Sequence, residues 1–165
     1  MKRVALLFVL LLLFPCSSWH ALAQSGVIAE MRLDELDGSV RKMSEYLQTG
    51  PVYLSFWALW CEPCKQELRA LKTIAKSHAD KAFTIIAVNQ DSPKSVHEVK
   101  TYVRSRGITF PVILDPNKQV FQAFNGQNIP FSVLLDKNGK VVKTRLGYLP
   151  GDEKEIETDI LGLFR

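Results

Sequence analysis

Two cysteines separated by two residues stand where an apolar run gives way to a helical pattern. Cys61 and Cys64 follow the apolar residues 52–57 and precede a segment whose apolar residues recur at helical spacing. In the first turn of a helix, unpaired N–H groups and the helix dipole lower the pKa of a thiol from about 8.5 to between about 3.5 and 7.5. The sequence therefore predicts that Cys61 is the exposed, reactive thiolate and that Cys64, one turn later, resolves mixed disulfides formed on it.

The first 23 residues have the three parts of a secretory signal peptide. A basic start is followed by an apolar run over residues 4–14 and by the small residues 21–23, which form a cleavage pattern. The apolar run is shorter than the about 20 residues that span a bilayer, so we favour cleavage over retention as a membrane anchor. Cys16 raises lipoprotein processing as an alternative, which the two residues before it disfavour. We therefore expect an exported, periplasmic protein with a signal peptide at 1–23 and one domain at 24–165.

Charge and cysteine content exclude several classes of function. The formal net charge is +4, and the leader contributes two of these charges, so the domain lacks the basic excess of a nucleic-acid-binding protein. Of the three cysteines, only Cys61 and Cys64 lie outside the leader. For an exported domain we favour thiol exchange over a structural disulfide or half of a metal site, because His78 and His97 offer no third ligand at a recognisable spacing.

The rest of the chain alternates between the patterns of strands and helices. Strands are expected at residues 52–57, 83–88, 110–114, 131–135 and 140–146, and helices at 62–76, 93–106, 120–124 and from Asp152 onward. Turn signals at 37–38 and 138–139 predict an N-terminal and a C-terminal hairpin. Asp152 and Glu155 have the spacing of a capping box at the start of the last helix. Together these elements predict an α/β fold in which a central mixed sheet is flanked by helices.

Residues 56–67, which include both cysteines, resemble the thioredoxin superfamily. More narrowly, they are similar to its exported TlpA/ResA-like branch, which includes the DsbE (CcmG) cytochrome c maturation proteins. Further landmarks of that branch follow in the same order along nearly the whole domain, at residues 36–38, 88–91, 93–114, 129–130 and 136–139. The resemblance implies a thioredoxin-like fold with an N-terminal hairpin and a central helix–strand insertion, and the activity of a thiol-disulfide oxidoreductase.

The resemblance also implies the parts of a redox site. Cys61 and Cys64 would form a reversible, redox-active disulfide, and we expect no other cofactor and no metal. A cis peptide bond at Ile129-Pro130 would face the cysteines and leave the Ile129 backbone free to pair with an incoming peptide. We expect the substrate groove to be formed by Trp60, Glu62, Pro63, Ile129 and Pro130.

Glu67 is the third catalytic residue that the resemblance implies, because a glutamate three residues after the second cysteine lies beneath the active site in this branch. Helical geometry agrees, since Glu67 falls close to the stripe of the helix that contains Cys64. Ordinary thioredoxins carry a buried aspartate where this chain has Ser55, so any acid that assists Cys64 must come from elsewhere, and Glu67 is the candidate. A plain surface glutamate is the alternative. Leu59 and Phe131 stand where the family has more polar residues, and we expect both to make the groove more apolar.

The leading hypothesis is an exported protein-disulfide reductase of the cytochrome c maturation type. Its partners would be cysteine-containing exported proteins, with cytochrome c apoproteins first, and a membrane or exported thiol donor would restore the dithiol. An oxidant or isomerase is the alternative within the same class, since Glu62 and Pro63 do not determine the direction of electron flow. A copper-handling module that uses the two thiols is the alternative from another class. We disfavour it because Met31 and Met43 lie far from the cysteines in sequence.

Overall fold

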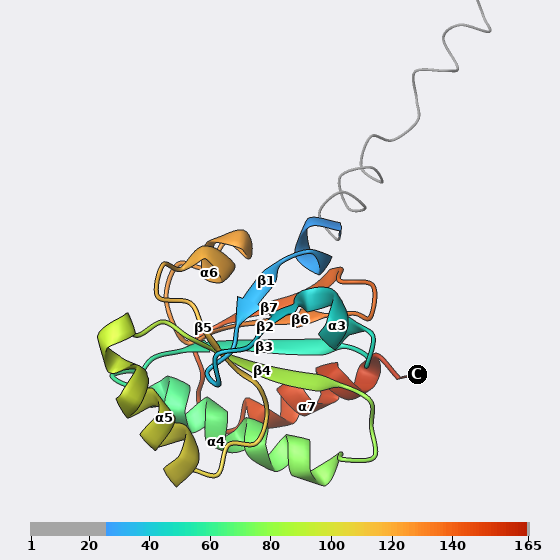
Figure 1. Ribbon diagram of the computed structural model, residues 1–165. Helices are drawn as coiled ribbons and strands as arrows, with labels where there is room; N and C mark the ends of the chain where they lie inside the picture. The colour runs from blue at the N-terminus through green and yellow to red at the C-terminus, as the bar shows by residue number, and fades with distance from the viewer. Residues whose placement is uncertain (1–25, 165) are drawn as a thin grey trace, which may run out of the picture.

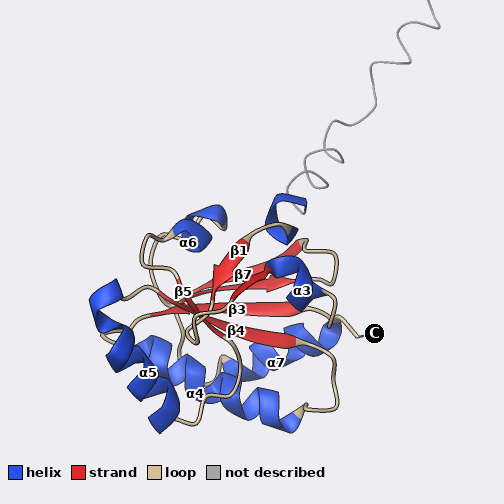
Figure 2. Cartoon of the chain, viewed as in Figure 1, coloured by secondary structure: helices blue, strands red, loops and turns tan. Residues whose placement is uncertain are grey.

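The computed structural model describes residues 26–164, in which a five-stranded mixed sheet is covered on both faces (Figure 1 and Figure 2). A separate two-stranded hairpin lies on one of those faces. The signal peptide expected at 1–23 lies outside the described residues. Between residues 26 and 164, no helix is both long and apolar enough to cross a membrane. The arrangement confirms the α/β fold and the N-terminal hairpin that the sequence predicts.

The sheet is built around β3 (Val52–Trp57), the strand that leads into the cysteine motif, and its strand order is β5-β4-β3-β6-β7. The other strands are β4 (Thr84–Asn89), β5 (Val112–Leu114), β6 (Phe131–Leu135) and β7 (Val141–Leu146). Neighbours β3, β4 and β5 are parallel, whereas β6 is antiparallel to both β3 and β7. Every residue of β3 is buried because the strand is covered on both faces, which explains its nearly unbroken apolar sequence.

Two layers of helices cover the sheet. On one face lie α4 (Glu62–Ser77), α5 (Val96–Ser105), which the short 3₁₀ helix η2 (Pro93–Ser95) precedes, and α7 (Glu153–Gly162). On the other lie α3 (Met43–Leu47), α6 (Gln119–Ala123) and the hairpin of β1 (Arg32–Asp34) and β2 (Val40–Lys42). Figure 1 shows the two layers below and above the sheet.

The sheet separates two apolar clusters. The cluster beneath the hairpin and α6 is rich in aromatic rings, with Phe56 packed against Phe121 and Phe131. The cluster beneath α4, α5 and α7 contains the apolar stripe of α4 together with both cysteines. The cysteine pair is therefore part of a packed core, where side-chain positions are held by dense contacts.

Asp152 precedes α7 but does not form the capping box that its spacing to Glu155 predicts. Its Oδ2 accepts a hydrogen bond from the N–H of Leu149 at 2.8 Å, in the turn before the helix. Glu155 instead pairs with Lys143 at 2.6 Å and with Arg145 at 2.9 Å, both on β7. The prediction was wrong because cations on a neighbouring strand compete with the helix end for the same carboxylate.

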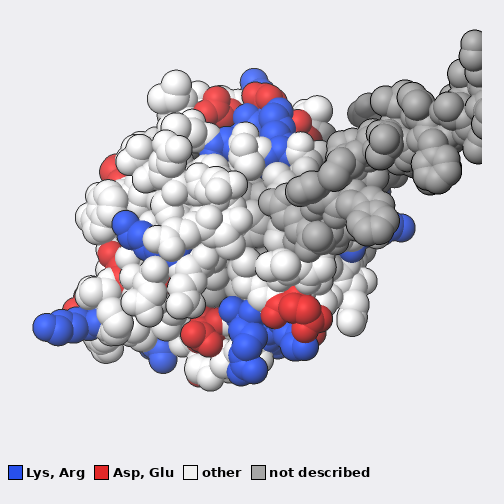
Figure 3. Space-filling model, turned by 90° about the horizontal axis from the view of Figure 1, so that it is seen from above, with Lys and Arg blue, Asp and Glu red and all other residues white. Residues whose placement is uncertain are grey.

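Figure 3 looks down on the side of the molecule that is uppermost in Figure 1. Basic and acidic side chains lie beside one another on this side instead of gathering by sign. Two of the ion pairs in the N-terminal region join Arg41 to Glu35 at 2.9 Å and Lys42 to Glu30 at 2.6 Å. Because opposite charges that lie close together cancel at a distance, this side produces little long-range field.

Candidate active site

Cys61 and Cys64 lie at the junction of β3 and α4, as the sequence predicts. Cys61 is the N-cap residue of α4, and the Cys61–Cys64 disulfide has an S–S distance of 1.97 Å and a Cα–Cα distance of 5.3 Å. The N–H of Cys64 points to Cys61 Sγ at 3.3 Å, so an unpaired donor of the first turn faces the sulfur. Pro63 lies in that first turn, where its missing N–H leaves no helical hydrogen bond unmade.

Neighbouring side chains, and not the two cysteine sulfur atoms, form most of the surface around the disulfide. Trp60 is 73 % exposed, and Glu62 and Pro63 are also exposed. That these residues form a substrate groove stays a prediction. Lys65 pairs with Glu62 at 2.8 Å and holds the pKa of that carboxyl below its usual range. Cys61 itself is only 4 % exposed in the disulfide form, and the exposure of its thiolate in the reduced form stays a prediction. Cys61 is buried in the disulfide form because its sulfur faces the first turn of α4 and packs into the core.

Backbone and side-chain contacts from β4 hold the loop before the cysteines. The Leu59 N–H donates to Asp91 Oδ2 at 2.8 Å, and the Asn89 side-chain amide donates to the same oxygen at 2.8 Å. The N–H of Gln90 donates to the carbonyl of Trp57 at 2.9 Å. The end of β4 therefore supports the loop that delivers Cys61 to the helix N-terminus.

The Ile129-Pro130 peptide bond is cis, as the resemblance implies. Phe131 pairs with Phe56 across β6 and β3, so Pro130 lies at the end of the sheet where the cysteine loop begins. Pro130 is buried and Ile129 is half-buried, and the Pro130 carbonyl accepts from the N–H of Gly147 at 2.8 Å. The structure thus brings Pro130 and the cysteines to the same end of the sheet.

Phe131 does not line the groove, contrary to expectation. Its ring is 7 % exposed and packs on the face of the sheet opposite α4, with ring centroids 5.6 Å from Phe56 and 5.7 Å from Phe121. The alternation of side chains along β6 decides its direction, because it places Phe131 on the face where Phe56 and Phe121 also lie. Leu59, the other expected apolar substitution, is half-buried beside the motif.

Glu67 is buried one helical turn beyond Cys64, with 2 % of its surface exposed. Residues three apart on a helix are neighbours, with about 5–6 Å between their Cβ atoms, so the carboxyl group belongs to the surroundings of Cys64. Tyr53 Oη lies 3.0 Å from Glu67 Oε1, and Ser55 Oγ lies 3.1 Å from Glu67 Oε2. The burial that the sequence predicts is confirmed, and the surface alternative is wrong.

Burial raises the pKa of Glu67 to about 7, because the charged carboxylate loses its hydration. Hydrogen bonds from Tyr53 and Ser55 favour the charged form and lower this pKa, and the positive charge of Arg145 acts in the same direction. The negative charge of Asp152 raises it. The balance leaves a carboxyl group beneath the cysteines that exchanges its proton near neutral pH.

Two further residues of this network, Tyr53 and Ser132, were not predicted from the sequence. Tyr53 contacts Glu67, and Tyr53 Oη also lies 2.7 Å from Ser132 Oγ on β6. Ser55 and Ser132 are partners across β3 and β6. A signal for both serines does exist in the sequence, since each is the polar residue of an otherwise apolar, buried strand. Such residues need hydrogen-bond partners, which makes them markers of a buried polar network.

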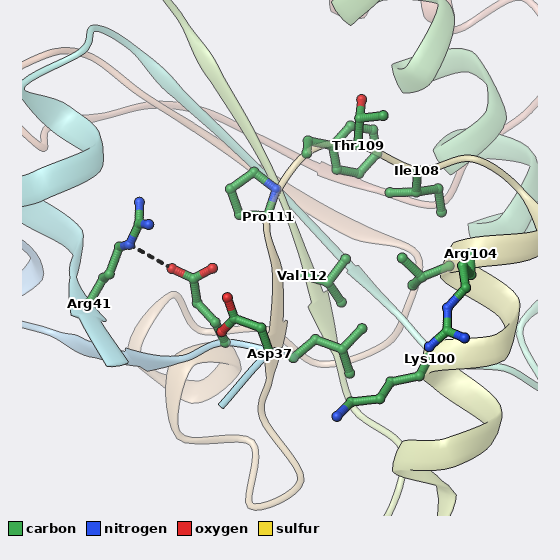
Figure 4. Close-up of a pocket in the computed structure, with 12 residues that line it drawn as sticks. Asp37, Arg41, Lys100, Arg104, Ile108, Thr109, Pro111 and Val112 are labelled. Carbon is green, nitrogen blue, oxygen red and sulfur yellow. Dashed lines mark ion pairs between the residues drawn. The ribbon is translucent and has the colours of Figure 1, made fainter. Parts of the chain in front are cut away.

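A surface cavity among the described residues lies away from the cysteines. It has a volume of about 550 Å³ and lies between the hairpin and α5, and Figure 4 shows Lys100 and Arg104 on one side and Arg41 on the other. Arg41 pairs there with Glu35 at 2.9 Å. None of the predicted site residues lines this cavity.

Among residues 26–164, no group of three or more His, Cys, Asp or Glu side chains is arranged to hold a metal ion.

A mixed sheet whose central strand delivers a cysteine pair to a helix N-terminus, beside a cis proline, defines the thioredoxin-like class of thiol-disulfide oxidoreductases. Comparison with known proteins narrows this class. The Redoxin family model matches residues 23–160, and the chain belongs to that family. It is a protein-disulfide oxidoreductase, as the sequence predicts.

Two relatives and one solved structure illustrate the similarity. The thiol-disulfide oxidoreductase ResA of Geobacillus thermodenitrificans is 31% identical over 133 residues, which cover 81% of this chain and 75% of that protein. ResA of Bacillus subtilis is 35% identical over 115 residues, covering 70% and 63% of the two chains. The crystal structure of a putative thiol:disulfide interchange protein DsbE from Chlorobium tepidum has a TM-score of 0.75 and 30% identity, covering 84% of this chain and 95% of its own.

Proposed function

We propose that this protein reduces disulfide bonds in exported partner proteins, with Cys61 as the nucleophile, Cys64 as the resolving thiol and Glu67 as the proton acceptor. The observation that carries the proposal is a buried carboxyl group one turn beyond Cys64, with its pKa raised to about 7. A group with this pKa both accepts and releases a proton near neutral pH, which suits general acid–base catalysis.

The reaction proceeds in two exchanges. The Cys61 thiolate attacks one sulfur of the partner disulfide, that S–S bond breaks, and the departing partner sulfur takes a proton from water. Cys64 then passes its proton to Glu67 and attacks Cys61 Sγ, which releases the second partner sulfur as a thiolate that is protonated in turn. Two electrons have moved to the partner, and the Cys61–Cys64 disulfide remains.

The cycle closes when an exported or membrane-bound dithiol donor reduces this disulfide. One thiolate of the donor attacks Cys61 Sγ, Cys64 leaves as a thiolate, and Glu67 returns its proton to Cys64. The second donor thiol loses its proton to water and attacks the donor sulfur that is bonded to Cys61, which releases Cys61 as a thiolate and leaves the donor as a disulfide. The disulfide form of the structure corresponds to the protein before this step. No cofactor besides the cysteine pair enters the scheme.

The charge of Glu67 favours the reducing direction. A negative charge beneath Cys64 opposes formation of the thiolate and so destabilises the reduced form of the protein. Strong oxidants differ in this respect, because they stabilise their reduced form. The helix dipole of α4 acts in the opposite direction on Cys61. A less stabilised thiolate means a less stabilised dithiol, and therefore a stronger tendency to give electrons away.

The surface near the cysteines supports a polypeptide partner. Trp60 presents an exposed ring next to Cys61, and Ile129 is half-buried beside Pro130. Mixed surface charge and a modest net charge do not favour a nucleic acid. The resemblance to cytochrome c maturation proteins makes apocytochrome c the first substrate to test, and the expected signal peptide supports export to the periplasm.

The reduction potential of the Cys61–Cys64 couple tests this proposal. Equilibration of the protein with dithiol buffers at neutral pH should give a reduction potential of about −270 mV, the value for thioredoxin. A value between about −180 and −120 mV, the range of isomerases and strong oxidants, would replace the reductant by one of those activities. Copper is titrated anaerobically into the reduced protein in parallel. Stoichiometric binding that survives competing thiols would overturn the proposal in favour of copper handling.

A further inference from the structure

Glu67 is the end of a chain of buried hydroxyl groups that runs from α4 over β3 to the neighbouring strand β6. From its Oε1 the chain passes to Tyr53 Oη at 3.0 Å and on to Ser132 Oγ at 2.7 Å, while Ser55 Oγ contacts Oε2 at 3.1 Å. All four residues are nearly inaccessible, with 0 to 3 % of their surface exposed. In such surroundings a polar group can form hydrogen bonds only with other protein groups and not with bulk water, so each donor needs an acceptor within the protein.

The chain satisfies Glu67 when the carboxyl group is charged. Each hydroxyl has one proton and accepts with its oxygen. Tyr53 then donates to Oε1, Ser55 donates to Oε2, and Ser132 donates to the oxygen of Tyr53. Both carboxylate oxygens accept a hydrogen bond, which favours the charge that burial opposes.

The same chain also satisfies Glu67 when the carboxyl group is neutral. A proton on Oε1 donates to the oxygen of Tyr53, and Tyr53 turns its own proton toward Ser132 Oγ. Only hydroxyl rotations are needed, so no side chain moves and the link from Glu67 to Ser132 stays complete. An apolar residue in place of Ser132 would leave the Tyr53 proton without an acceptor in this state, which is costly for a buried donor.

We propose that Tyr53 and Ser132 form a reversible hydroxyl relay behind Glu67, which lets this carboxyl group accept and release a proton without leaving a buried polar atom unpaired. Both are positioning residues, since they act on the cysteines only through Glu67. The inference rests on the proposed role of Glu67 as the proton acceptor for Cys64.

Charged and titratable groups on the surrounding elements act on the same carboxyl group. On β7, Arg145 favours its charged form, and Asp152 before α7 opposes it. The Tyr148 hydroxyl lies 2.8 Å from Glu153 Oε2, and its own proton is held by that neighbour. Lys143, Arg145 and Asp159 lie around Tyr53 and Ser132. These groups are unchanged in the variants below, so they shift all of the titrations alike.

The relay predicts opposite shifts for two deletions of a single oxygen. Tyr53→Phe removes a donor to charged Glu67 and should move the titration midpoint of that carboxyl group upward by about one pH unit. Ser132→Ala leaves that donor in place but removes the acceptor needed by the neutral form, and should move the midpoint downward. A purely structural role for either residue predicts no pair of opposite shifts.

The midpoint is read in the oxidised protein from the ¹³C resonance of the Glu67 carboxyl group, which Glu67→Gln identifies by its loss. Tyr46→Phe is the matched control, because the Tyr46 hydroxyl donates to the carboxylate of Glu35 at 2.7 Å, outside the active site. It should leave the midpoint unchanged. Stopped-flow measurement of the resolution step over the same pH range should show the same two shifts.

Shifts in the same direction, or an unmoved midpoint in either variant, would overturn the relay. Ser132→Ala carries the test alone if Tyr53→Phe does not fold, because a midpoint that is unmoved or raised in that variant contradicts the inference. The proposed function fails in a different way. If Glu67→Gln leaves the pH profile of resolution as in the wild type, Glu67 is not the proton acceptor, and the proposed function and the relay are both overturned.

Discussion

Replacing Glu67 by Gln should remove a large pH dependence from the stability of the oxidised protein. In the folded protein, burial raises the pKa of Glu67 from 4.5 to about 7, whereas the unfolded chain exposes the group to water. The stability associated with neutral Glu67 is therefore fully present below pH 4.5 and is lost as the pH rises through about 7. Gln keeps the shape of the side chain and does not ionise.

The size of the effect follows from the shift in pKa. The difference between 4.5 and about 7 corresponds to about 3 kcal/mol, at about 1.4 kcal/mol for each pKa unit. The free energy of unfolding of the wild type, relative to that of Glu67→Gln, should fall by about this amount between about pH 4 and about pH 8. Such a loss is a substantial part of the free energy of unfolding of a typical folded protein, which is about 5–15 kcal/mol.

The measurement is guanidinium unfolding of both oxidised proteins across this pH range, followed by fluorescence and circular dichroism. Glu98→Gln is the matched control, because it makes the same change at an exposed position of α5. Its difference from the wild type should stay constant. If the difference for Glu67→Gln also varies by less than about 0.5 kcal/mol, the carboxyl group titrates as an exposed one and the desolvation argument is wrong.

Two further predictions concern the cysteines and the loop before them. Cys64→Ala should accumulate mixed disulfides with partner proteins and Cys61→Ala should not, because in the proposed mechanism only Cys61 attacks the partner. Gels run without reductant show which variant traps, and the reverse pattern would exchange the two roles. Asp91→Ala should lower the free energy of unfolding by about 1–3 kcal/mol and slow disulfide reduction, because the Leu59 N–H and the Asn89 amide lose their shared acceptor. Unchanged stability together with an unchanged rate would show that Asp91 does not hold the loop.

The redox motif and the fold around it could be predicted because their signals are local. An apolar run, two cysteines and a helical repeat follow one another within residues 52–76, and each pattern reflects the period of its own element. The position of Glu67 near the stripe of Cys64 also followed from the helical repeat alone. The Asp152 capping box was wrong although its spacing was right, because cations on β7 take Glu155.

Contacts between distant segments could not be obtained in this way. Tyr53 and Ser132 are 79 positions apart in the chain, and Leu59 and Asp91 are 32 apart, so no periodic pattern links either pair. Phe131 follows the cis proline in sequence, but its ring belongs to the aromatic cluster on the other face of the sheet.

The sequence by itself determined where the two cysteines stand and that they lie at the N-terminus of a helix, because both depend on residues close together in the chain. Only the packing of α4 against β3, and of β3 against β6, decided that Glu67 is shielded from water and bonded to hydroxyl groups from two strands. Burial and hydrogen bonding set the pKa of a carboxyl group, and both are properties of the assembled core.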